Sequence, residues 1–365
     1  MFKLRSVYIS LSKALRPATC SQDPAILTNK QTFCNESVPN RSREQVAGCR
    51  NINYQQTLNL PKFVFILCSV LLIAATDLSQ LYHKLNANPN QNISARITRI
   101  SAEFLGKPYE LGALGEGQFG DYDQFPLFRT DAFDCETYVD TVLALALAHD
   151  DASFQHYINQ IRYKNGQVSF ITRNHFTDLD WNINNQKQGF MTDITTNIRD
   201  ADDHPVAFMA QALIDKPSWY QHFSTDKIRI KNASKMVVAE RLSSLKQAGL
   251  QLPRRVATIP YLPLSALFKA NGQPNMYLFK QIPNAAIIEI IRPDWDLQNQ
   301  IGTHLNVSHL GFAIWKNGQL FFRQASSTQH QVVDSVMIDY LRDAISSPTI
   351  KGINVQVVRE LKNPT

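Results

Sequence analysis

Cys135 stands apart from the other cysteines of this 365-residue chain. The remaining four lie within the first 68 residues, at Cys20, Cys34, Cys49 and Cys68. Asp134 is a good N-cap, so a helix beginning here places Cys135 in its first turn. The free backbone N–H groups and the helix dipole at that position favour a thiolate. The sequence therefore predicts a nucleophilic cysteine with a lowered pKa.

The alternative is a small buried side chain, which is the commoner role of a lone cysteine. Helical spacing carried back from Val139 and Val142 reaches position 135, so periodicity allows burial as well. A nucleophilic cysteine additionally needs a base and a group that orients the base. Partner residues elsewhere in the chain therefore decide between the two interpretations.

His309 is the best candidate base among nine histidines, because a polar residue is out of place at the start of the apolar strand Ser308–Trp315. An edge-strand histidine that faces solvent is the alternative. The facing strand of the expected hairpin carries Gln324, whose amide oxygen can accept from one imidazole nitrogen and leave the other for sulfur. Gln324 can equally be a surface polar residue. His175 is the rival base, in a polar loop.

Helices before residue 250 and strands after it predict an α+β fold. A loop rich in Gly and Asp is expected at 110–131, and a polar irregular region at 172–235. Apolar periodicity and turn residues predict the remaining elements. Helices are expected near 93–104, 134–148, 152–161, 236–248 and 335–345, and strands at 168–171, 286–291, 308–315, 320–325 and 353–358.

An apolar run of 13 residues, Phe63–Ala75, follows Lys62. It is shorter than the roughly 20 residues of a membrane span and has the length of a signal-peptide core. A buried core helix is the alternative. We expect residues 1–76 to be a leader, with 1–57 a misassigned or disordered extension, and residues 77–365 to be a single exported domain, periplasmic or secreted.

The net charge of +6 belongs to that leader, which holds nine Lys and Arg against three Asp and Glu. Residues 77–365 carry 28 of each and are neutral, so charge gives no reason to expect binding to nucleic acid or to an anionic membrane. No H-E-x-x-H, paired C-x-x-C or calcium-loop spacing occurs, so no metal or other cofactor is expected.

The helix-borne Asp-Cys and the strand-borne Ser-His-Leu-Gly-Phe resemble the NlpC/P60 superfamily of papain-like cell-wall hydrolases. The chain resembles more closely its DUF1460 branch, a family of N-acetylmuramoyl-L-alanine amidases, over residues 93–360. The segments that carry this likeness are Gly106–Tyr109, Phe133–Tyr138, Ile161–Gly166, Thr172–Trp181, Ile259–Pro260, Ser308–Trp315, Gln324–Ser327 and Lys351–Ile353.

The resemblance implies a papain-like core with a family-specific insertion, with Cys135 as nucleophile and His309 as base. The third position is usually His in the family, and Gln324 occupies it here. A second departure is Pro283–Ala285, where the family usually has Gly-Asp. The resemblance further implies substrate contacts by Tyr109, Asp134, Arg173, His175, Asp178 and Trp181.

A loop carrying Arg, His, Asp and Trp can stack on a sugar and pair with a carboxylate. A solvated loop with a structural Arg–Asp pair, and a core position for Tyr109, are the alternatives. The resemblance implies cleavage of the amide between N-acetylmuramic acid and L-Ala in peptidoglycan or its fragments. A D-Glu–diaminopimelate endopeptidase and a catalytically silent peptidoglycan-binding module are the other two hypotheses.

Overall fold

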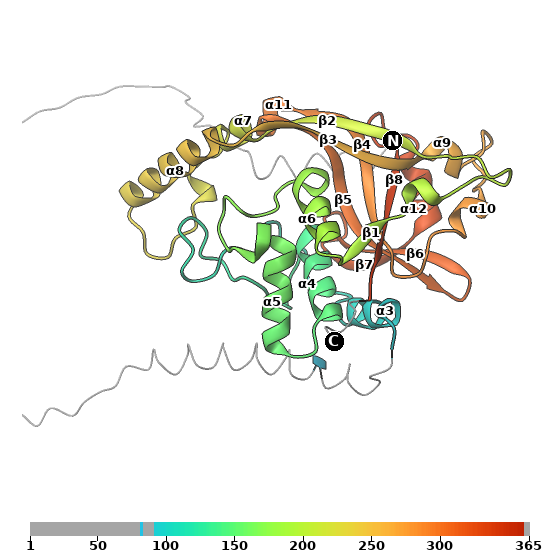
Figure 1. Ribbon diagram of the computed structural model, residues 1–365, viewed down its shortest axis with the longest axis horizontal. Helices are drawn as coiled ribbons and strands as arrows, with labels where there is room; N and C mark the ends of the chain where they lie inside the picture. The colour runs from blue at the N-terminus through green and yellow to red at the C-terminus, as the bar shows by residue number, and fades with distance from the viewer. Residues whose placement is uncertain (1–80, 83–90, 361–365) are drawn as a thin grey trace, which may run out of the picture.

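The computed structural model describes residues 81–82 and 91–360. The expected leader, with its apolar run and four cysteines, lies outside these residues. One antiparallel sheet of eight strands forms the centre of the fold, in the order β2-β3-β8-β4-β5-β6-β7, with β1 also paired to β8 (Figure 1). The strands are β1 (Met191–Asp193), β2 (Phe208–Asp215), β3 (Arg254–Pro263), β4 (Ile287–Leu297), β5 (Thr303–Lys316), β6 (Gln319–Ser326), β7 (Gln331–Val336) and β8 (Gly352–Val358).

Three helices form a layer at one side of the sheet, and their apolar faces share a core with β4 and β5. They are α3 (Ile93–Glu103), α4 (Cys135–Leu147) and α5 (Asp151–Arg162). Every residue of α4 from Thr137 to Leu147 is buried. A helix that is buried on all sides lies inside a protein, and α4 accordingly lies between α3, α5 and the sheet.

A second core forms where α12 (Met337–Ala344) and two short helices pack against β4, β5 and β6. The short helices are α9 (Leu264–Leu267) and α10 (Met276–Phe279). The long α8 (Lys235–Leu250) packs mainly against α7 (Lys216–Gln221), beside the β2–β3 ribbon in Figure 1. None of the described helices is both long enough and apolar enough to span a membrane.

The α+β class is confirmed, as are the five expected helices and the expected strands β4, β5, β6 and β8. Asn317 and Gly318 form the β5–β6 turn with φ of 50° and 78°, the left-handed conformation that Asn-Gly turns use. The strand expected at 168–171 is wrong, because these residues form a turn. The polar region 172–235 is also more regular than expected, since it contains β1, β2 and α7.

Candidate active site

Cys135 is the first residue of α4, as its sequence predicted. The Asp134 side chain accepts from the N–H of Thr137 at 2.8 Å, and the Thr137 hydroxyl accepts from the N–H of Asp134 at 2.9 Å. This reciprocal capping box fixes where the helix begins. The second carboxylate oxygen of Asp134 accepts from the N–H of Gly112 at 2.9 Å. Asp134 therefore joins the start of the helix to the preceding loop.

The prediction of a lowered Cys135 pKa is wrong. Burial raises the pKa of the thiol, and the negative charges of Asp134 and Glu136 raise it further. Hydrogen bonds from the N–H groups of Leu310 and Glu136 act in the opposite direction without reversing the shift. At a helix start that is partly buried and flanked by two carboxylates, desolvation outweighs the helix dipole. The raised pKa favours a neutral thiol in the resting protein.

The N–H that reaches the Cys135 sulfur belongs to Leu310, the residue that follows His309 on β5, so the backbone of β5 passes next to the sulfur at this point. Burial lowers the pKa of His309 to about 4, although its contact with Gln324 and the charge of Asp134 favour the imidazolium. The imidazole is therefore neutral at neutral pH and has a free lone pair. A neutral imidazole can accept a proton, and the role of His309 as the base for Cys135 stays a prediction.

Gln324 lies on β6, and its Oε1 contacts His309 Nε2. An amide oxygen only accepts hydrogen bonds, so the imidazole proton resides on Nε2 and the lone pair on Nδ1. The Gln324 amide nitrogen in turn donates to Ser335 on β7 at 3.4 Å. The orienting contact expected from the sequence is thus present, and the neighbouring strand supports it.

Strands β5 and β6 lie close together at Gly311, which has no side chain to separate them. A Cβ added at position 311 would lie 2.5 Å from the carbonyl oxygen of Arg323 and 3.1 Å from the Cβ of Gln324. The first distance is well inside van der Waals contact, so a side chain there would push the strands apart. The glycine therefore sets the distance across which Gln324 reaches His309.

Tyr109 lies beside the candidate site. Its backbone pairs with Phe133, two residues before Cys135, and its N–H donates to His330 at 2.9 Å. The partly buried Tyr109 side chain packs against the same core as Cys135. A contact with substrate at this position stays a prediction.

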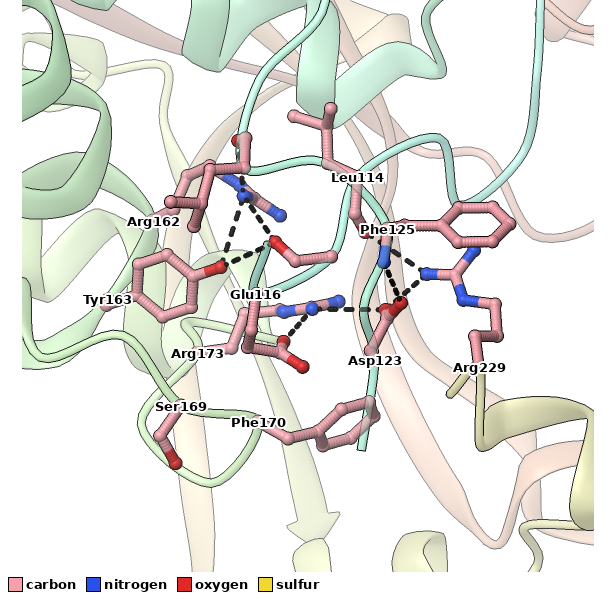
Figure 2. Close-up of polar contacts among 12 residues, drawn as sticks. Leu114, Glu116, Asp123, Phe125, Arg162, Tyr163, Ser169, Phe170, Arg173 and Arg229 are labelled. Carbon is pink, nitrogen blue, oxygen red and sulfur yellow. Dashed lines mark hydrogen bonds and ion pairs between the residues drawn. The ribbon is translucent and has the colours of Figure 1, made fainter. Parts of the chain in front are cut away.

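Arg173 lies in a buried ion network, which Figure 2 shows. Its guanidinium pairs with Glu116 and, at 3.3 Å, with Asp123, and it packs over the ring of Phe170. Arg229 binds the same Asp123 carboxylate. Glu116 and Asp123 belong to the expected loop at 110–131, so their carboxylates hold this loop against Arg173. These contacts account for Arg173 structurally, and its role in substrate binding stays a prediction.

His175 lies in an aromatic cluster of its own. Its Nε2 donates to the carbonyl oxygen of Phe170 at 2.7 Å, and its ring lies 4.8 Å from those of Phe170 and Trp219. Burial and the nearby Arg173 lower the pKa of His175 well below its usual value. The Nε2 proton of His175 is thus used in a hydrogen bond to a carbonyl oxygen, whereas His309 precedes Leu310, whose N–H reaches the Cys135 sulfur. The choice of His309 over His175 as the base stays a prediction.

Asp178 and Trp181 are both buried in the π-helical turn η2 (Thr177–Trp181). Asp178 accepts from the Asn306 amide at 2.7 Å, and burial raises the pKa of its carboxyl. Trp181 is 1% exposed, and its indole N–H donates to Asp140 of α4 at 2.8 Å. Both side chains hold η2 between α4 and the sheet, and their contacts with substrate stay predictions.

Glu136, Ser335 and Gly311 take part in the site although sequence reasoning did not select them. Glu136 raises the pKa of Cys135 through its charge, and burial with the charge of Asp140 raises the pKa of Glu136 itself. Glu136 could have been predicted from the sequence, because it is a carboxylate directly after the candidate nucleophile. Ser335 could not, because strand β7 was not expected.

Within the described part of the chain, the acidic and histidine side chains that gather closely enough for a metal ion are Asp200, Asp202 and His204. They lie on an exposed turn in which Asp200 already accepts from the N–H groups of Asp202 and His204 at 3.0 and 2.8 Å. These hydrogen bonds account for the cluster as a turn, and none of the three residues belongs to the candidate site.

Two solved structures resemble this protein. A protein from Legionella pneumophila assigned to DUF1460 is 53% identical, with a TM-score of 0.78, over 80% of this chain and 97% of its own. An N-acetylmuramoyl-L-alanine amidase from Bacteroides uniformis shares the fold at 22% identity and a TM-score of 0.52, over 73% of this chain and 99% of its own. No curated protein sequence matches the chain.

The profile of the AmiA-like family, described as N-acetylmuramoyl-L-alanine amidase-like, matches residues 99–350. This range includes Cys135, His309 and Gln324, and it covers well over half of the chain. The chain belongs to the N-acetylmuramoyl-L-alanine amidase-like family, DUF1460.

Proposed function

We propose that this protein is a cysteine amidase that hydrolyses the amide between N-acetylmuramic acid and L-Ala in peptidoglycan or its fragments. Family membership supports the bond and the substrate class. One observation carries the cysteine mechanism: the Cys135 sulfur accepts from the N–H of Leu310, the residue that follows a His309 whose Nε2 contacts Gln324. The same helix-to-strand placement supports a papain-like, NlpC/P60 relationship.

In the first step, Nδ1 of His309 takes the thiol proton as the sulfur of Cys135 attacks the lactyl carbonyl carbon. The N–H of Cys135, at the first position of α4, has no partner within the helix and can donate to the oxyanion. The imidazolium then gives its proton to the departing nitrogen of L-Ala, and a thioester remains. Water, deprotonated by His309, attacks the thioester and releases the acid and the thiol.

The raised pKa of Cys135 fits this sequence of proton transfers. The thiolate forms only while His309 accepts the proton, so the charges appear together during attack. Gln324 keeps the second imidazole proton on Nε2 throughout and thereby holds Nδ1 towards the reaction. An amide orients the ring without adding charge, and we therefore assign Gln324 to positioning the base.

Peptidoglycan lies outside the cytoplasm, so the proposal includes export, with residues 63–75 as the signal core. We infer no stable membrane insertion once the signal is removed, and no nucleic-acid partner, since residues 77–365 are neutral. N-terminal sequencing of the exported protein tests this part. An N-terminus at Met1 would contradict it.

Defined muropeptides test the reaction. We expect the protein to release a muramic acid product and a peptide beginning with L-Ala, both identified by mass spectrometry, and Cys135→Ala to bind the same substrate without turnover. An L-Ala–D-Glu dipeptide as product would instead indicate a D-Glu–diaminopimelate endopeptidase. Binding without turnover by the unaltered protein would indicate a peptidoglycan-binding module.

A further inference from the structure

A cavity of about 260 Å³ opens beside the loop that precedes Cys135. Its aromatic wall comes from Phe119, Tyr122 and Phe170, and its polar groups include Glu116, Asp121 and Ser169. No Lys or Arg lines it. Pockets that enclose a whole small ligand usually measure about 300–1,000 Å³. This cavity therefore suits one residue of a longer substrate.

Glu116 gives the cavity an unused hydrogen-bond acceptor. The residue is 6% exposed and pairs with Arg173 through one carboxyl oxygen, whereas Oε2 has no hydrogen-bond partner among the described residues. Figure 2 shows the carboxyl beside Arg173, on the side of Phe170. A buried acceptor without a donor is destabilising. Burial also raises the pKa of Glu116 in spite of Arg173. A ligand that donates to Oε2 would supply the missing hydrogen bond and would stabilise the ionised form of Glu116.

The other lining groups favour a cationic donor. Ammonium groups bind to the faces of aromatic rings, and three aromatic side chains form the wall. Asp121 adds a carboxylate that is 74% exposed and pairs with Arg241 at 3.4 Å. An anionic group, in contrast, would meet two carboxylates, since Arg173 and Arg241, which pair with them, are not lining residues.

The cavity is also joined to the catalytic helix. Arg229 pairs with Asp123 of the same loop and donates to the carbonyl oxygen of Gly112 at 2.6 Å. The N–H of Gly112 donates to Asp134, the cap in front of Cys135. This chain of contacts links the loop that lines the cavity to the start of α4.

We propose that this cavity binds the side-chain ammonium of a diamino acid in the peptide part of the substrate. The assignment rests on the proposed function, since it places a substrate peptide next to Cys135. It makes Glu116 and Asp121 specificity-determining residues, with Phe119 and Tyr122 as the walls around the cation.

The test compares two muramyl peptides that differ only in whether the lysine side chain is free or N-acetylated, with lysine placed at each peptide position in turn. We expect kcat/KM to be about tenfold higher for the free amine at one position, mostly through KM. Asp121→Asn and Glu116→Gln should bring this ratio close to one while turnover of the acetylated peptide persists. Asp343→Asn, an exposed carboxylate on α12, is the matched control and should leave the ratio unchanged.

Thermal unfolding identifies a Glu116→Gln variant that has lost its fold, and Asp121→Asn on the exposed rim then carries the test alone. Equal rates for the free and the acetylated peptide at every position would overturn the proposal and leave the amidase standing. Competition by free N-acetylglucosamine together with equal rates would show that the cavity binds a sugar instead.

Calorimetry with Cys135→Ala separates this proposal from the proposed function. If no peptide is hydrolysed but the free amine still binds more tightly than the acetylated one, the cavity assignment stands and the amidase assignment fails. If peptides are hydrolysed and the binding of both forms is equal, the reverse holds.

Discussion

His309 Nε2 on β5 contacts Gln324 Oε1 on β6, and this contact fixes which imidazole nitrogen can act as a base. The two residues are 15 positions apart in the chain and are joined by the Asn317–Gly318 turn. Because Gln324 is neutral, it leaves burial as the largest influence on His309, whose pKa is about 4. The contact thus combines a fixed orientation with an uncharged base.

The pH dependence of hydrolysis should therefore show an acid limb near pH 4, because His309 is protonated and inactive below its pKa. Gln324→Glu places a carboxylate against Nε2 and stabilises the imidazolium. We expect its acid limb to move upward by about one pH unit or more. The measurement is kcat/KM against pH for both proteins. An unchanged limb in Gln324→Glu would contradict the role of His309 as the titrating base.

Alkylation of Cys135 should be slow at neutral pH and still rise above about pH 8.5, the pKa of a free cysteine. The reason is that burial, Asp134 and Glu136 raise the pKa of its thiol. Iodoacetamide labelling, followed by peptide mapping, distinguishes Cys135 from the four cysteines of residues 1–68. A reactivity plateau below pH 7 would show instead that the helix start stabilises the thiolate.

Gly311→Ala should destabilise the protein by about 1–3 kcal/mol, as overpacking usually does, and lower kcat. The added Cβ would overlap the carbonyl oxygen of Arg323 and press on Gln324. Gly318→Asn in the same hairpin is the control, since its surroundings are open and Asn tolerates the φ of 78°. Denaturant unfolding and steady-state kinetics provide the readouts. Equal stability of the two variants would contradict the close-approach argument.

Asp134→Ala should cost more stability than Asp150→Ala, although both residues cap a helix with the same reciprocal box. Loss of a cap costs about 0.5–2 kcal/mol, and Asp134 additionally accepts from Gly112. Free energies of unfolding from urea titrations compare the two. If Asp150→Ala is equally destabilising, the link from Asp134 to the loop contributes nothing measurable.

Glu289 on β4 is fully buried, and burial raises the pKa of its carboxyl to about 8. Between pH 4.5, its ordinary pKa, and pH 8 the folded protein holds a proton that the unfolded chain has lost. Stability therefore falls as pH rises through this window. Glu289→Gln should remove that fall and be more stable at pH 8, on the order of a few kcal/mol.

Unfolding free energies at pH 5, 6.5 and 8 test the Glu289 prediction, with the exposed Glu240→Gln as control. The amide of Asn182, which donates to Glu289 at 3.1 Å, can still donate to the carbonyl oxygen of Gln at this position. Parallel pH profiles for Glu289→Gln and the unaltered protein would show that Glu289 is not protonated in the folded state.

Local sequence determined the elements that carry the candidate site. The cap at Asp134, the apolar helix after Cys135 and the Asn317–Gly318 turn depend on neighbouring residues alone, so their patterns predicted α4 and the β5–β6 hairpin. The hairpin in turn predicted that Gln324 faces His309. Strand β2 and the turn at 168–171 were missed, because pairing with β3 and packing around Phe170 decide them.

Only the tertiary structure decided the charge states and the use of the polar loop residues. The helix dipole at Cys135 is a local property, whereas the desolvation that reverses its effect comes from β5 and from packing around α4. Arg173 and Trp181 have the chemistry of ligand-binding residues, yet their partners Glu116 and Asp140 lie 57 and 41 positions away. Burial and distant partners depend on how the chain closes on itself, and no local pattern in the sequence encodes them.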